Sequence, residues 1–147
     1  MTIRDFLMED HRHCDDLFAA AEQSANAGDL AAARAAFGQF RDAVFRHFAG
    51  EEQTLFPAFE ARTGMSMGPT QVMRMEHGQM RELIDVAVDA LQDGNSEEFF
   101  GQAETLLIMM QQHNMKEENV LYPMCDQQLA DSSALLVERL QSGLKGA

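Results

Sequence analysis

The chain has 147 residues, 46% of them hydrophobic, and a formal net charge of −13 at pH 7. This length and apolar content suit one domain, residues 1–147, with a core of its own. Nucleic acids and anionic membrane surfaces attract basic patches, so the acidic balance argues against both as partners. The first residues lack the basic start and apolar run of a signal peptide, and no apolar stretch approaches the ~20 residues of a membrane span. A cytoplasmic location is therefore expected.

The first half of the chain predicts two long helices. The first is expected over about residues 2–27, with Gly28 as its stop signal. Asp29 can cap the second, which is expected over about residues 29–62 and to fray after Pro57. Apolar residues recur every three or four positions along both segments, which is the period of a helix with one buried face.

The second half repeats this arrangement and adds a short tail. A third helix is expected over about residues 69–92, and a fourth over 96–129 with Asn95 or Ser96 as its cap. A fifth, over about 132–142, is expected to pack on the outside. Four long amphipathic helices joined by short loops predict an all-α fold, an up-down-up-down four-helix bundle with a short C-terminal extra helix.

The chain contains two cysteines, Cys14 and Cys125. They form neither a CxxC pair nor a zinc-ribbon spacing. In a reducing compartment they are best interpreted as two buried or half-buried thiols rather than a disulfide.

One short phrase occurs twice in the sequence. HFAGEEQTLFP begins at His47 and HNMKEENVLYP begins at His113, 66 positions later. The same interval separates His11 from His77, and each of these histidines follows an acidic residue. The repeat predicts a bundle of two similar halves, with helices one and two in one half and helices three and four in the other.

Six polar residues of this repeat fall on the apolar faces of the helices, where Leu or Phe would be usual. They are His11, His47, Glu51, His77, His113 and Glu117. Residues four apart lie on one face of a helix, so each glutamate points the same way as the histidine before it. Burying an uncompensated carboxylate costs several kcal/mol, and metal ions compensate well. Neutral imidazole and carboxylate together suit iron, manganese or zinc, whereas the alternative is a buried hydrogen-bonded network without metal.

A geometric hypothesis follows from the two halves. His11 and His47 would bind one metal, His77 and His113 a second, and the two glutamates would bridge them. With a solvent-derived bridge each metal would remain below six-coordinate, which leaves room for a small ligand. The order histidine, then glutamate four later, differs from the ferritin-like pattern, in which glutamate precedes histidine by three.

At these residues the sequence resembles the hemerythrin-like, or HHE cation-binding, family. The matching segments are EDHRHCDDLF, HFAGEEQTLFP, MEHGQM and HNMKEENVLYP, which cover all four long helices. The resemblance implies a four-helix bundle around a non-haem di-iron centre, oxo- or hydroxo-bridged, with the same six residues as iron ligands. Arg81 stands where oxygen-carrying members have a fifth histidine, and a guanidinium does not ligate metal. The set of four histidines and two glutamates looks more like bacterial proteins implicated in iron-centre repair and nitric-oxide defence.

Several neighbouring residues are expected to have no role in the site. His13 lies about 200° from His11 around its helix and should face solvent. Glu52 and Glu118 follow the site glutamates and should be solvated. Arg81 should extend outward, and packing accounts for Tyr122.

The predicted function is that of a non-haem di-iron binding protein with an open position for O2 or NO, in oxygen, nitric-oxide or iron handling or in stress defence. The methionine-rich core would favour such ligands over water. The alternatives are a di-iron redox enzyme that reduces peroxide, O2 or NO, or an iron donor for iron-centre repair. No catalytic residue beyond the ligands is predicted, and zinc or manganese in place of iron is the less favoured cofactor.

Overall fold

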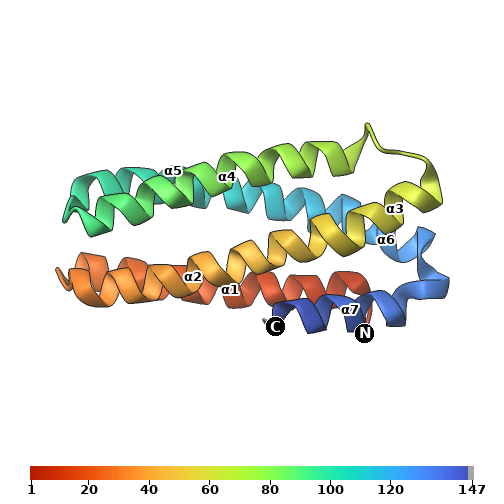
Figure 1. Cartoon of the computed structure of the whole chain (residues 1–147), viewed down its shortest axis with the longest axis horizontal. Helices are drawn as coiled ribbons and strands as arrows, with labels where there is room; N and C mark the ends of the chain where they lie inside the picture. Colours follow the sequence, from red (N-terminus) through yellow and green to blue (C-terminus); the bar gives the residue numbers. More distant parts are fainter. Residues whose placement is uncertain (146–147) are drawn as a thin grey trace.

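The computed structural model describes residues 1–145, so the last two residues of the expected domain lie outside it. The chain is all helical over this part and forms the expected bundle (Figure 1). The helices of the first half are α1 (Ile3–Asn26), α2 (Leu30–Gly50) and α3 (Phe56–Thr63). Those of the second half are α4 (Pro69–Gln92), α5 (Ser96–Lys116), α6 (Tyr122–Gln128) and α7 (Ser133–Leu144), with a 3-10 turn at Ala130–Ser132. None of the helices in residues 1–145 is long and apolar enough to cross a membrane.

The helix ends carry the expected local signals. The Asp29 side chain accepts the Ala32 amide at the start of α2, and the Asn95 side chain accepts the Glu98 amide at the start of α5. These side chains satisfy amides that have no partner within the first turn. Gly64 ends α3 in the left-handed region with φ of 74°, where a glycine has no side-chain strain.

The second helix does not fray at Pro57, and the expectation that it would do so is wrong. It passes from α2 through a π-helical turn, η1 (Glu51–Leu55), directly into α3. The equivalent turn, η2 (Glu117–Leu121), joins α5 to α6. A π turn bonds each amide to the carbonyl five residues back, and such turns often mark functional sites. Here both turns begin at a glutamate of the repeated phrase.

The proline of each phrase leaves one carbonyl of each π turn without a backbone donor. In the π register the amide bonded to the carbonyl of Glu52 or Glu118 would belong to a proline, which has no N–H. An arginine side chain donates a hydrogen bond to each of these carbonyls instead. Arg74 Nη1 donates to the oxygen of Glu52 at 3.4 Å, and Arg4 Nε donates to that of Glu118 at 2.7 Å. The helices therefore continue past both prolines without an orphaned carbonyl at these positions.

The bundle contains two apolar clusters, one toward each end. One is built around Phe18, Phe37, Phe40 and Phe99 near the α1–α2 and α4–α5 loops. The other contains Leu55, Phe56, Phe59, Tyr122 and Leu129 near the opposite end. Each of the four long helices passes from one cluster to the other, and the six polar residues of the repeat occupy the level between them. The site is thus closed above and below by packed apolar side chains.

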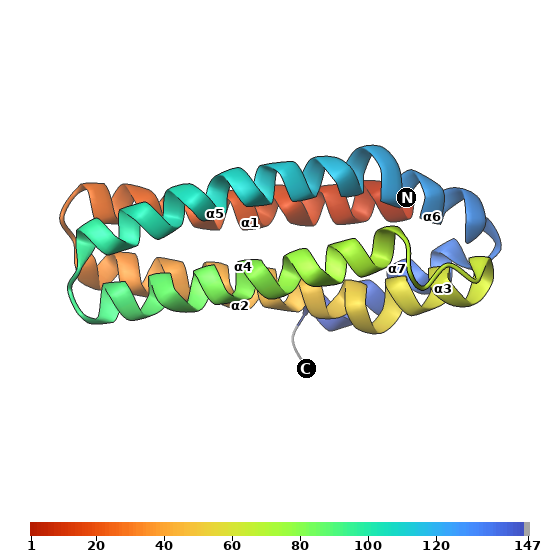
Figure 2. The ribbon, with the colours of Figure 1, turned by 90° about the horizontal axis from the view of Figure 1, so that it is seen from above.

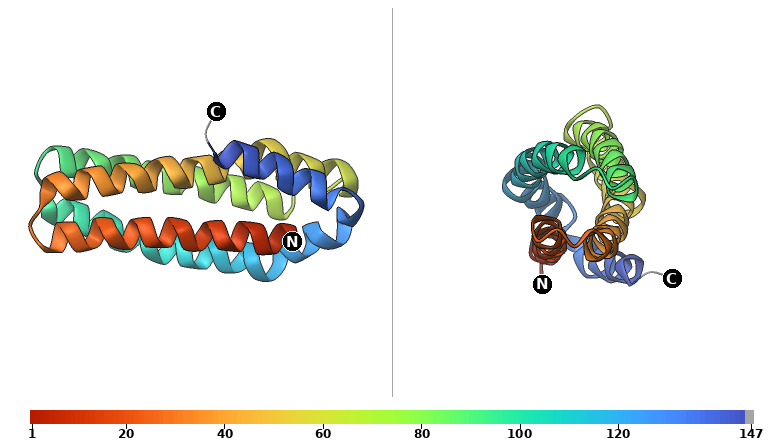
Figure 3. Two further views of the ribbon diagram at one scale, coloured as in Figure 1. Left: turned by 90° about the horizontal axis from the view of Figure 1, so that it is seen from below. Right: turned by 90° about the vertical axis from the view of Figure 1, so that its left-hand side faces the viewer.

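Helix α7 covers the first half of the bundle from outside, beside α1 and α2 (Figures 2 and 3). Leu136 and Leu140 are its buried residues. A side-chain carbon added to Gly50 would lie 3.2 Å from Leu140 Cδ2, so the glycine permits this close approach. The equivalent of Gly50 in the second half of the repeat is Lys116, and in the described part of the chain no helix covers the face on which Lys116 lies. The two halves therefore differ on the outside.

Candidate metal centre

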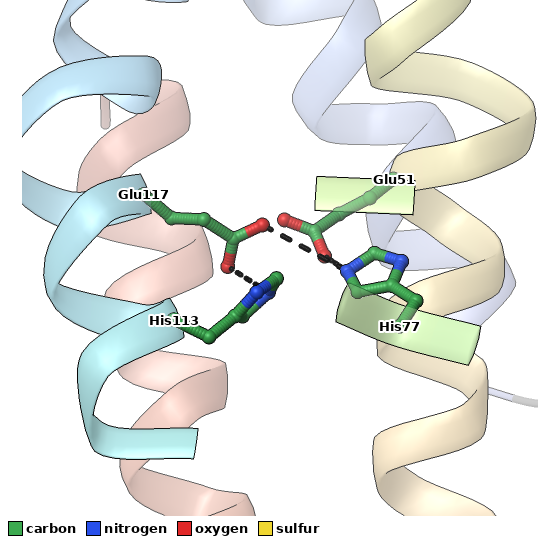
Figure 4. Close-up of side chains that lie close together, drawn as sticks. All are labelled: Glu51, His77, His113 and Glu117. Atoms are coloured by element: carbon green, nitrogen blue, oxygen red, sulfur yellow. Dashed lines mark ion pairs between the residues drawn. The ribbon is translucent and has the colours of Figure 1, made fainter. Parts of the chain in front are cut away.

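The structure brings all six candidate residues together in the middle of the bundle. Each is buried, with between 0% and 5% of its surface exposed. Ligand atoms of Glu51, His77, His113 and Glu117 lie within 4.8 Å of one another, and so do those of His11, His47 and Glu117. Figure 4 shows the first of these groups, with both glutamates pointing at each other across the core. The histidines divide between the two groups as they divide between the two halves of the sequence repeat, and Glu117 belongs to both groups.

Every histidine of the site is held by a carboxylate at its outer nitrogen. The Nδ1 atoms of His11, His47, His77 and His113 lie 2.6–2.8 Å from oxygens of Glu118, Asp10, Glu52 and Glu76, respectively. A carboxylate only accepts, so each Nδ1 carries the hydrogen and each Nε2 presents a lone pair to the interior. Carboxylate partners fix the orientation of metal-binding histidines in the same way. The four acidic partners come from the positions directly before His11 and His77 and directly after the two site glutamates.

The expectation that Glu52 and Glu118 are solvated is wrong. Their side chains are only 21% and 24% exposed, and each bonds a histidine of the other half of the bundle. The cause is that adjacent helical residues point about 100° apart, so a second glutamate reaches the neighbouring helix rather than solvent.

Arg81 does not extend into solvent either. Its two terminal nitrogens bind the two oxygens of Glu52, each at 2.9 Å, while Glu52 also accepts from His77. This bidentate geometry is the strong form of the arginine–carboxylate pair. The partly buried Glu52 experiences a desolvation effect that favours its neutral form, but the hydrogen bonds of His77 and Arg81 lower its pKa to about 2. Arg81 thus acts on the site through His77 and not as a ligand.

When the four imidazoles are neutral, the centre of the site contains more acceptors than donors. The Nε2 atoms of His11 and His113 lie 3.2 and 3.3 Å from Glu117 Oε1. Those of His77 and His47 lie 3.1 and 3.4 Å from Glu51 Oε1. Lone pairs would face carboxylate oxygens at these distances, which is repulsive unless a cation or a proton lies between them.

Four buried side-chain atoms of the site have no hydrogen-bond partner among the described residues. They are Glu51 Oε1, His77 Nε2, His113 Nε2 and Glu117 Oε2. Buried polar atoms of native proteins are otherwise almost always paired, and each exception needs a cause. Imidazole nitrogens and carboxylate oxygens that converge in this way fit a transition-metal cation.

Protons compete with a cation for the same lone pairs. Burial acts to lower the pKa of His113, but the charge of Glu117 and its hydrogen bond outweigh burial and raise this pKa to about 9. Burial is likewise outweighed at His47, where the charge of Glu51 and the bond to Asp10 raise the pKa well above its usual value. A bound cation would displace these protons, because metal ligands must be deprotonated.

Tyr122 belongs to the site, which sequence reasoning missed. Its ring is completely buried, and its hydroxyl donates to Glu51 Oε2 at 2.7 Å or to Glu117 Oε1 at 3.0 Å. The same oxygen lies 3.2 Å from His11 Nε2 and 3.3 Å from His47 Nε2. The sequence contained an indication of this role. The repeat has Phe56 at the equivalent position, and a tyrosine there adds one polar atom to a ring that is expected to be buried.

The other residues singled out in the sequence lie outside this centre. His13 is exposed, as expected from its angle on α1. Cys14 and Cys125 are buried free thiols, and burial together with nearby acidic groups raises the pKa of both well above the usual range.

Fold and site together define a class of protein: a helical bundle with buried histidines and glutamates whose arrangement fits a metal cation. The family model of the hemerythrin HHE cation-binding domain matches residues 2–125, and the chain belongs to this family. No curated protein and no solved structure matches the chain. The match covers all four long helices and each of the six buried polar residues.

Proposed function

We propose that this chain holds two iron ions at the centre of the bundle. His11 and His47 hold one, His77 and His113 hold the other, and Glu51 and Glu117 bridge them. The observation that supports this most directly is the set of inward lone pairs facing carboxylate oxygens at 3.1–3.4 Å. Two cations would relieve this repulsion at all four histidines, and the outer carboxylates already orient the rings for binding.

We further propose that the centre has an open position for O2 or NO and acts in the handling of oxygen, nitric oxide or iron, or in stress defence. Iron supplies the affinity for such diatomic molecules and the ability to change oxidation state. The chain supplies apolar surroundings on the side of His77. The ring of Phe48 stacks on that imidazole at 4.0 Å, and that of Phe56 lies 5.8 Å away. These rings present no hydrogen-bonding group to water, so a small apolar molecule has the advantage there.

The test is anaerobic loading with ferrous iron followed by elemental analysis and visible spectroscopy. We expect two irons per chain, and a spectrum that changes on addition of O2 or NO. His113→Gln should lower the iron content, whereas His13→Gln, at an exposed histidine on α1, should leave it unchanged. A wild-type protein that binds no iron after reconstitution would refute the proposal. A band that forms with O2 and disappears on its removal would identify reversible binding.

A redox enzyme is the second candidate, and Tyr122 is the observation that favours it. The sequence offered no protonatable group beyond the six, but the structure places a hydroxyl 2.7 Å from Glu51 Oε2 inside the closed site. Such a group can hold or deliver a proton where solvent cannot enter. Sustained consumption of peroxide, O2 or NO by the iron-loaded protein with a reductant present would establish turnover, and a single stoichiometric oxidation would exclude it.

A further inference from the structure

One difference between the two halves of the bundle lies at residue 56 and its equivalent in the repeat, residue 122. Tyr122 and Phe56 occupy equivalent positions, each directly after a π turn and directly before a proline. Phe56 packs its ring on the His77 side without a polar atom, with the ring centroids 5.8 Å apart. Tyr122 lies against His11 in the same way, at 5.7 Å, and adds a phenolic oxygen. The chemistry of the two metal positions should therefore differ.

The phenolic oxygen has more acceptors around it than it can satisfy. Glu51 Oε2, Glu117 Oε1, His11 Nε2 and His47 Nε2 surround it at 2.7–3.3 Å. A hydroxyl has one hydrogen to donate, and both imidazoles, in the neutral form that binds metal, carry theirs on the outer nitrogen. In that form at least three of these four contacts bring acceptor atoms together. With neutral imidazoles a hydrogen-bonding role alone does not explain this position.

The spacing fits that of neighbouring ligands on one cation. Two donor atoms bound at right angles with bonds of ~2.1 Å are about 3 Å apart. The distances from the phenolic oxygen to the two histidine nitrogens, 3.2 and 3.3 Å, and to Glu117 Oε1, 3.0 Å, are close to this value. The oxygen thus lies where a further ligand of that position belongs.

Tyr122 also has little freedom to move aside. It is completely buried, begins α6 and precedes Pro123, whose ring restricts the backbone. Its ring packs within the cluster that includes Leu55, Phe59 and Leu129. A cation bound by His11 and His47 would therefore meet the phenolic oxygen.

We propose that the phenolic oxygen of Tyr122 is a ligand of the metal position formed by His11 and His47. This inference rests on the proposed metal centre and adds a seventh ligand to it. The hydroxyl proton is released to solvent as the oxygen binds, because a bound cation stabilises the anionic form. The position at His77 and His113 has Phe56 in place of the tyrosine and so has one protein ligand fewer. The small ligand then binds on that half of the centre, and the two irons are inequivalent.

The composition of the chain makes the test direct, because Tyr122 is its only tyrosine. The full chain is loaded with iron, oxidised in air, and measured for iron content, visible absorption and resonance Raman scattering. We expect two irons per chain and a charge-transfer band whose Raman spectrum contains phenolate ring vibrations. Tyr122→Phe should keep the helical circular dichroism and lose both the band and the vibrations. Tyr122→Phe combined with Phe100→Tyr restores the tyrosine content far from the site and should not restore them.

The outcomes separate this inference from the function on which it rests. Two irons without phenolate vibrations in the wild-type spectrum would overturn the role of Tyr122 and leave the iron centre intact. Vibrations that persist in Tyr122→Phe would overturn it as well. A wild-type protein without iron would instead refute the proposed function. The wild-type measurement decides the question even if Tyr122→Phe fails to fold, since no other tyrosine exists to give the signal.

Discussion

Replacing Glu51 with glutamine should distinguish a metal ligand from a structural carboxylate. Glu51 is completely buried, and its Oε1 lies 3.1 Å from His77 Nε2 and 3.4 Å from His47 Nε2. Glutamine has the same shape, and its amide can donate to either nitrogen. In the metal-free protein the charge of Glu51 outweighs the effect of burial and raises the pKa of His47. The variant loses this buried ion pair, and its amide N–H can donate only to a neutral imidazole. We expect its free energy of unfolding to fall by about 3–5 kcal/mol even without metal.

The metal-loaded variant should show a further loss of stability. A ligand at 100 times its dissociation constant stabilises the folded state by ~2.7 kcal/mol, so two such sites contribute about 5 kcal/mol. For a chain of this size 1 kcal/mol corresponds to about 2–4 °C in Tm, which gives an increment of about 10–20 °C on metal loading. Glu51 is proposed to bridge both positions, so the variant should lose more than half of this increment.

Thermal unfolding followed by circular dichroism, with and without metal at fixed free concentration, measures both quantities. Glu104→Gln, at an exposed glutamate on α5, is the matched control and should retain the full increment. If Glu51→Gln lowered the Tm of the metal-free and metal-loaded forms equally, the carboxylate would be a structural hydrogen-bonding group. The reasoning from inward lone pairs would then fail.

Three further outcomes follow from the site. Glu52→Gln should weaken metal binding by about 10–100-fold in a chelator competition, because His77 loses its orienting carboxylate; unchanged affinity would show that this contact is incidental. The metal-free protein should be most stable at about pH 5–6. The raised pKa of His113, about 9, stabilises the folded state fully below pH 6.5, and this stabilisation is lost as the pH rises toward 9. The lowered pKa of Glu52, about 2, stabilises the folded state above pH 4.5, and this stabilisation is lost as the pH falls from there. A metal-free Tm that rose between pH 6.5 and 9 would contradict this sign. Cys14 and Cys125 should react with a thiol reagent only after unfolding, since burial raises the pKa of both; fast reaction of the folded protein would argue against the packing around them.

The helical period and the sequence repeat together were sufficient to predict which six residues would meet. Residues at i and i+4 share a face whatever the surroundings, so the sequence alone could place the pairs His47–Glu51 and His113–Glu117. The sequence repeat then assigned His11 and His77 to the same level. Such predictions depend on local geometry and on the high cost of burying polar groups.

The residues around the six were harder to predict, because their positions depend on contacts between helices. Glu52 and Glu118 looked solvent-facing on an isolated helix, yet each reaches a histidine on a neighbouring helix. The π turns could not be foreseen from helical periodicity, which assumes one bond pattern throughout. Tyr122 was interpreted as packing because Phe56 packs in the same way, and the extra oxygen is significant only where four acceptors surround it. The single domain over residues 1–147 and the assignment of metal ligands stay predictions.

The two halves also differ in the carboxylates that bind the Nδ1 atoms of the four histidines. Glu52 and Glu76, which hold His77 and His113, are paired with Arg81 and Lys116. In contrast, within residues 1–145 the side chains of Asp10 and Glu118 form ion pairs with His47 and His11 alone. A carboxylate with its charge partly neutralised attracts the Nδ1 hydrogen less strongly, and its histidine is then the weaker electron donor. In the proposed iron centre the imidazoles of His11 and His47 would therefore be the more electron-donating pair, on the side where Tyr122 is proposed to add an anionic oxygen. Both effects would stabilise the higher oxidation state at that position, and the proposed small ligand would bind at the other position, beside Phe56.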